Sequence, residues 1–225
     1  MTKRFPLGVV PAVLLASLGL AACGGDAEER AEPSGVLSWD EVRGALLEDG
    51  SSVAGADVGP EDFAGFADER TADPASCQPL STIIDLEPKP YRSARVQVDR
   101  RLGAWVHVQL LTYAGDEARE VFEMVDEAVD DCSAGYDEDR VIAARITGVE
   151  RTDAPDLGDA VTSYRTTWTE AEADEPIELL EHMVLVRDGQ QLLSFRAGDL
   201  SSDGEAEELL AAVVDAQWKR YEERP

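Results

Sequence analysis

The sequence has few basic residues, and this shortage limits the partners of the protein. Twenty Lys and Arg stand against 47 Asp and Glu, which gives a net charge of −27 over 225 residues. A field of that sign opposes binding to nucleic acid and to anionic lipid head groups. We interpret the acidic residues as a solvated surface, and we expect no nucleic-acid partner.

The residue patterns that carry catalysis are also missing. The sequence contains neither G-x-S-x-G nor H-E-x-x-H, and its two histidines are His107 and His182. Acidic stretches at 137–140 and 170–176 lack the spacing of a calcium loop and are interpreted as solvated loops. We therefore expect no enzyme, no metal and no cofactor. A hydrolase with a carboxylate pair stays as a less favoured alternative, because sequence does not fix the distance between two carboxylates.

The N-terminus has the three blocks of an export signal. A short basic start, Lys3-Arg4, precedes an uncharged apolar run that ends in Leu20-Ala21-Ala22-Cys23. Prolines and glycines within the run make it a poor permanent membrane helix. The residues before Cys23 resemble a bacterial lipobox, in which the cysteine thiol receives a diacylglycerol and the chain is cut before it. An uncleaved anchor and plain secretion are the alternatives.

This interpretation predicts a lipid-anchored protein on the extracytoplasmic face of the cell membrane. Residues 1–22 would be the signal peptide, and its removal changes the net charge from −27 to −29, because it takes away Lys3, Arg4 and no acid. Residues 23–35 are rich in Gly, charge and Pro, and are expected to form a flexible tether with a reach of about 20 Å. Residues 36–225 are expected to form a single domain.

Two cysteines, Cys77 and Cys132, remain once Cys23 carries lipid. In an oxidising compartment two such thiols are expected to form a disulfide. Closing that loop would stabilise the fold by roughly 3–4 kcal/mol in the chain-entropy model. The alternative is a pair of unpaired buried thiols.

The hydrophobic pattern of residues 36–225 predicts an α+β fold. A short helix is expected to begin after Ser38, with Glu41 completing a capping box, and to end at Gly50. Residues 51–79 are interpreted as an irregular wrap pinned by Cys77. A helix at 116–132 shows one apolar stripe, and a last helix is expected to begin at Ser202 with Glu205 as its box partner.

Alternating apolar residues predict six strands, at 93–101, 104–113, 140–152, 159–169, 178–187 and 190–198. The turn Asp188-Gly189 predicts a two-residue hairpin loop. In that register Glu181 faces Arg196, Met183 faces Ser194 and His182 faces Phe195. The order α-β-β-α-β-β-β-β-α predicts an antiparallel sheet with helices packed on one face.

This order resembles the extracellular sensor domains of actinobacterial Ser/Thr receptor kinases, the PknH-like sensor family. The resemblance lies in the export segment, the helix that begins Leu-Ser-x-x-Glu-Val, one cysteine before the sheet, and a second near the end of an Ala-x-x-Val-Phe helix. Members often carry a second disulfide, absent here, and no kinase is attached to this chain. The PsbP/Mog1-like lipoproteins share the layout. The resemblance implies a module that binds a ligand or partner in a cleft between sheet and helix.

Candidate ligand-binding residues are aromatic side chains near a cation and a histidine: Trp105, Tyr164, Arg165, Trp168 and His182. Core packing is the alternative role for each of them, and for His182 in particular. The favoured hypothesis is a non-enzymatic sensor or ligand-binding lipoprotein, held at the membrane through Cys23, whose partner is an unknown small molecule. The alternative is an interaction module for another protein of the cell envelope, for which a large exposed apolar patch on the sheet would argue.

Overall fold

The computed structural model of the chain describes residues 33–60, 70–100, 103–140, 143–170, 178–199 and 204–224. The predicted signal peptide, Cys23, the tether up to residue 32, and Ser202 lie outside these residues. The helices are α1 (Trp39–Gly44), the 3-10 turn η1 (Ala75–Cys77), α2 (Gln78–Ser81), α3 (Glu117–Asp131) and α4 (Glu205–Glu222). In the described part of the chain, no helix is both long and apolar enough to cross a membrane.

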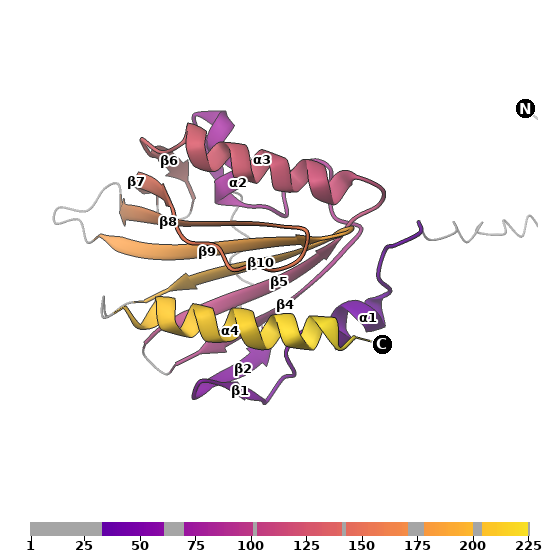
Figure 1. The fold of residues 1–225 in the computed structure, drawn as a ribbon. Helices are drawn as coiled ribbons and strands as arrows, with labels where there is room; N and C mark the ends of the chain where they lie inside the picture. Colours follow the sequence, from indigo (N-terminus) through magenta and orange to yellow (C-terminus); the bar gives the residue numbers. More distant parts are fainter. Residues whose placement is uncertain are drawn as a thin grey trace, which may run out of the picture. The chain divides into compact units, whose positions relative to one another are not determined.

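The strands form one antiparallel sheet in the order β1-β2-β4-β5-β10-β9-β8-β7-β6-β3 (Figure 1). Their bounds are β1 (Ser52–Val53), β2 (Ala56–Pro60), β3 (Thr71–Asp73), β4 (Arg92–Asp99), β5 (Trp105–Thr112), β6 (Tyr136–Asp139), β7 (Ala144–Arg151), β8 (Ala160–Glu170), β9 (Leu179–Asp188) and β10 (Gln191–Gly198). The predicted α+β class with an antiparallel sheet is confirmed.

The helices cover both faces of the sheet, so the predicted packing on one face is wrong. Successive residues of a strand point to opposite faces. On β9, Val184 and Val186 belong to the apolar cluster beneath α4, whereas Leu185 belongs to the cluster beneath α3. Figure 1 shows the two helices on opposite sides of the sheet. The unbroken apolar run Met183–Val186 is the sequence signal for this arrangement, because strands buried on both faces lose their alternation.

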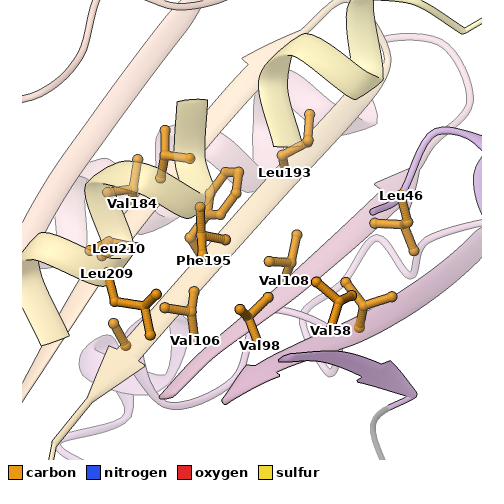
Figure 2. Packing of buried hydrophobic residues seen from close by; sticks show 14 of the residues in the cluster. Leu46, Val58, Val98, Val106, Val108, Val184, Leu193, Phe195, Leu209 and Leu210 are labelled. Carbon is orange, nitrogen blue, oxygen red and sulfur yellow. The ribbon is translucent and has the colours of Figure 1, made fainter. Parts of the chain in front are cut away.

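The larger core lies between α4 and the strands at the centre of the sheet. Figure 2 shows how its aliphatic side chains interdigitate around Phe195; the labelled members are Leu46, Val58, Val98, Val106, Val108, Val184, Leu193, Phe195, Leu209 and Leu210. Phe195 is fully buried. Burial of this apolar area is the main force that holds α4 and the central strands together.

The second core lies beneath α3 and contains the predicted disulfide. The whole predicted apolar stripe of the helix is buried: Ala118, Val121, Phe122, Val125, Ala128, Val129 and Cys132. Cys132 is bonded to Cys77, with 5.9 Å between the two Cα atoms. Both cysteines are almost fully buried. The disulfide therefore joins the C-terminal end of α3 to the turn η1, as expected.

Three local predictions need correction. The segment 51–79 is not an irregular wrap, since it contributes β1, β2, β3, η1 and α2. Its strands have two to five residues each, too short to produce a readable alternation. Helix α4 begins at Glu205 with Gly204 as its N-cap, at φ +77°. Helix α1 has the predicted capping box between Ser38 and Glu41 but ends at Gly44, not at Gly50.

The early end of α1 depends on a residue of α4. The fully buried Gln217 donates its amide to the carbonyl of Ala45 at 2.7 Å and accepts the backbone N–H of Leu47 at 3.0 Å. The side chain thus pairs a carbonyl that the end of the helix leaves unpaired and the N–H of a residue just beyond the helix. This contact links α1 to α4 although the residues lie far apart in the sequence.

The β9–β10 hairpin is present, but its register differs from the predicted one. Asp188 pairs with Gln191, so the loop is Gly189-Gln190 and Gly189 takes φ +56°. Glycine at the first loop position is what a type II′ turn requires. Asp188 stays in the strand, where its carboxylate accepts the hydroxyl of Tyr221 at 2.8 Å. Facing pairs shift by two residues, which leaves every side chain on its predicted face.

Candidate functional site

The structure divides the five predicted ligand-binding residues between the two faces of the sheet. The strand registers place Trp105, Tyr164 and Trp168 on the side of α3. Arg165 and His182 face each other on the opposite side, where α4 lies. The sheet therefore separates the predicted set into two groups, which do not meet in one site.

His182 and Arg165 lie near the N-terminal end of α4. Arg165 pairs with Glu150, with 2.6 Å between Nη2 and Oε2. Burial lowers the pKa of His182 from its ordinary value near 6.5, the negative charge of Glu207 opposes the shift, and the positive charge of Arg165 adds to it. The observed partner strands place Ala197, not the predicted Phe195, opposite His182.

On the α3 side, polar and aromatic side chains occupy the sheet next to the apolar core. We call this region the polar face; it comprises Arg70, Trp105, His107, Gln109, Tyr136, Glu138, Arg140, Tyr164, Trp168, Glu181 and Arg196. Trp105 lies against Gly198, where a Cβ atom would collide with the indole ring, and its ring is in edge contact with His107 at 4.6 Å. Glycine at position 198 therefore allows the indole to pack closely against β10.

The centre of the polar face is an ion pair between Arg196 and Glu181. The guanidinium donates to both carboxylate oxygens, at 2.7–2.9 Å, and the two side chains are only 25% and 12% exposed. Burial by itself lowers the pKa of Arg196, and the nearby Glu181, helped by Glu138, reverses that effect and raises it. The opposite charges noted in the sequence do meet, although Arg196 faces Met183 and reaches Glu181 diagonally.

A second charged group lies toward the edge of the sheet, on β6. The side chain of Glu138 is 3% exposed. Its Oε2 lies 3.3 Å from Nε of Arg140, and its Oε1 lies 4.0 Å from Nη1 of Arg70. Burial and the neighbouring Arg196 lower the pKa of Arg70. The guanidinium of Arg140 lies 4.4 Å from the ring centroid of Trp168, in cation–π contact. The prediction of a solvated loop at 137–140 is therefore wrong, because Glu138 is buried among arginines.

Two buried tyrosines complete this group. Burial raises the pKa of Tyr164, as do the nearby Tyr136 and Glu181, so its hydroxyl keeps its proton at physiological pH. Burial and Glu138 do the same for Tyr136. Both hydroxyls are thus neutral groups that can donate and accept hydrogen bonds.

Two buried donors of the polar face have no hydrogen-bond partner in the described part of the chain. They are the indole Nε1–H of Trp168 and the side-chain amide Nε2 of Gln109. Buried donors are nearly always paired in folded proteins, so such atoms mark places where a bound molecule or water would be held. The polar face thus combines aromatic rings, paired charges and unpaired donors, which are groups that contact bound molecules in ligand sites.

Sequence reasoning missed most of the charged members of this site. Arg70, Glu138 and Arg140 carry no pattern that marks them as buried, and they come from two segments brought together by the pairing of β3 with β6. Within the described residues, no group of three or more His, Cys, Asp and Glu side chains could hold a metal ion.

Comparison with known proteins gives a fold but no family. No family model matches the chain, and no curated protein matches it. The solved extracellular domain of PknH from Mycobacterium tuberculosis aligns with a TM-score of 0.55 at 12% identity, over 82% of this chain and 98% of that domain. An uncharacterised protein from Mycobacterium smegmatis aligns at 0.36 and 15% identity, over 67% and 77% of the two chains, too weak to carry an argument.

The fold class is therefore an antiparallel α+β fold that is also found in a solved extracellular domain. More particularly, the chain shares the fold of the PknH extracellular domain, in line with the resemblance stated from the sequence.

Proposed function

We propose that the protein is a membrane-anchored extracytoplasmic lipoprotein that binds a small molecule on the polar face and acts as a sensor without catalysing a reaction. The observation that carries this proposal is the partly buried ion pair of Arg196 and Glu181, flanked by unpaired donors and aromatic rings. The shared fold with an extracellular domain supports the location. The lipobox-like residues before Cys23 support the anchor.

The charged groups argue against hydrolysis by a carboxylate pair. Glu181 is bound by Arg196, and Glu138 lies between Arg70 and Arg140. A general acid instead needs an apolar environment that keeps its carboxyl group protonated. These two carboxylates are better suited to orienting a bound molecule than to proton transfer.

The alternative of a protein-docking module has less support. In the described part of the chain, the large hydrophobic side chains that are exposed are Trp39, Tyr91 and Leu180, and of these only Leu180 lies on the sheet. A single exposed leucine is ordinary for a protein surface.

Native mass spectrometry of the protein released gently from cell membranes tests ligand binding. We expect a mass above that of the acylated chain, and we expect it to disappear in the double variant Arg196→Met/Glu181→Leu. The matched control removes the exposed pair Arg145 and Asp137, which lie 2.9 Å apart at 63% and 61% exposure, and should keep the added mass. An absence of added mass in the wild type would contradict the proposal.

The anchor has its own test. Cys23→Ser should abolish acyl labelling and leave the precursor uncleaved, since the thiol is the proposed attachment point. A Cys23→Ser protein that is processed and partitions with membranes as before would contradict the anchor without affecting ligand binding.

A further inference from the structure

Two exposed aromatic side chains are held together by one buried arginine. Trp39 is 49% exposed and Tyr91 is 45% exposed. The guanidinium of Arg92 lies 5.8 Å from the ring centroid of Trp39 and 4.9 Å from that of Tyr91. Arg92 is itself 8% exposed and donates to the carbonyl of Leu37 at 2.8 Å. The two rings, here called the aromatic pair, are thus fixed on the surface by a single buried cation.

The aromatic pair lies where the chain joins the domain. The carbonyl of Gly35 accepts the side-chain amide of Gln191 at 2.9 Å, and the N–H of Leu37 bonds the hydroxyl of Thr112 at 3.1 Å. The N–H of Tyr91 bonds the carbonyl of the same Thr112 at 2.8 Å. Trp39 follows Leu37 by two residues, so both rings flank the point from which the chain leads back to Cys23.

We propose that the aromatic pair lies in the membrane interface and orients the domain on the bilayer. This inference rests on the proposed lipid attachment at Cys23. Trp and Tyr are the side chains enriched at membrane–water interfaces, because each has an apolar ring and a polar tip. Half-exposed rings on a rigid support lose little conformational entropy when they enter that layer.

The short chain between Cys23 and Leu37 would keep the aromatic pair close to the bilayer that holds the lipid. Thirteen residues separate Cys23 from Leu37, and random-coil scaling for that number of residues gives a reach of about 20 Å. Confinement within such a distance gives the rings an effective concentration in the millimolar range at the bilayer surface. A weak affinity of the two rings for lipid is then sufficient to hold them in the interface. The net charge of −29 without the signal peptide opposes anionic head groups, so the aromatic pair should prefer zwitterionic lipid.

Fluorescence quenching of the acylated full chain in lipid vesicles tests the proposal. Vesicles of phosphatidylcholine with brominated acyl chains quench only indoles that enter the interface. The contribution of Trp39 is the difference between the wild type and Trp39→Phe, which leaves the other three tryptophans as background. We expect Trp39 to be quenched by the brominated lipid and protected from acrylamide in the water.

Two variants decide whether the aromatic pair acts as a unit. Tyr91→Ser should reduce the quenching of Trp39 by lipid, because the neighbouring ring no longer enters the bilayer. Leu180→Ser is the matched control, since Leu180 has the same 45% exposure as Tyr91 but lies elsewhere on the sheet. Tyr91 bonds Thr112, which is in line with Gln191 and Asp188 at the end of β9, whereas Leu180 lies near the start of that strand. Leu180→Ser should leave quenching unchanged.

Phosphatidylglycerol in the vesicles should reduce quenching, and added salt should restore it.

Three results would overturn the inference. In the first, acrylamide still quenches Trp39 although the protein floats with the vesicles, which would show that the domain does not contact the bilayer. Equal losses in Tyr91→Ser and Leu180→Ser would show that the aromatic pair has no special role. Protection of Trp39 in native membranes but not in vesicles of pure lipid would assign the aromatic pair to a protein partner. Failure to float at all would instead contradict the anchor at Cys23.

Discussion

The guanidinium of Arg196 and the carboxylate of Glu181 meet diagonally across the β9–β10 hairpin, with 2.7 Å between Nη2 and both oxygens. Glu181 stands directly opposite Gly198, which has no side chain to compete for this space. A diagonal reach of this kind is within the length of an arginine side chain. The predicted ion pair is therefore present, although the observed hairpin register differs by two residues from the one that the sequence predicted.

Arg196→Ala should destabilise the protein by about 3 kcal/mol, because it leaves Glu181 buried without its partner. The double variant Arg196→Met/Glu181→Leu should recover most of that loss, since neither charge of the pair remains to be left without its partner. Urea denaturation followed by circular dichroism measures both. The exposed Arg145 is the control, and Arg145→Ala should leave the denaturation midpoint unchanged. Equal effects of Arg196→Ala and Arg145→Ala would show that the buried pair is no stronger than a surface pair.

Gln217→Met should cost about 2 kcal/mol, because the carbonyl of Ala45 and the N–H of Leu47 lose their partner. Loss of this contact should also loosen α1, and hydrogen exchange at Leu47 should become faster. Gln97→Met provides a comparison, since Gln97 is half-buried and its amide bonds the exposed carboxylate of Asp99. If Leu47 exchanges at the same rate in both variants, Gln217 does not secure the end of α1.

Removal of the disulfide by Cys77→Ala/Cys132→Ala should lower the stability by about 4 kcal/mol, because the bond closes a loop of 55 residues in the unfolded chain. The midpoint of thermal unfolding should fall by roughly 10 °C for a domain of this size. Scanning calorimetry gives the shift. A reductant should lower the midpoint of the wild type in the same way and leave the double variant unaffected.

Acidification should weaken the fold through His182. Burial lowers the pKa of this imidazole, so the unfolded state binds its proton more readily than the folded state. The contribution of His182 is fully present above the ordinary pKa near 6.5 and is lost as the pH falls below it. The difference in unfolding free energy between wild type and His182→Gln should therefore shrink from about pH 7 to about pH 5. A difference that is constant with pH would contradict a neutral, desolvated His182.

The sequence by itself determined the elements with strong periodicity and the residues whose chemistry acts locally. The apolar stripe of α3, the long strands and the capping box of Ser38 and Glu41 follow from spacing along the chain. Cys77 and Cys132 could be paired by counting, because no other thiol remained once Cys23 was assigned to lipid. Local periodicity records which face of an element is apolar, and it is independent of the partner that covers that face.

Tertiary structure decided which face each helix covers and which charges are buried. Glu138 looks like any acid of a polar stretch, and only the pairing of β3 with β6 brings Arg70 to it. In the observed register of β9 with β10, Asp188 stays in the strand and accepts a hydrogen bond from Tyr221, a residue of α4. Trp39 and Tyr91 share one cation because Arg92 follows Tyr91 and lies beside α1. In each case the deciding contact joins residues distant in the chain, and no pattern of neighbouring residues encodes such a contact.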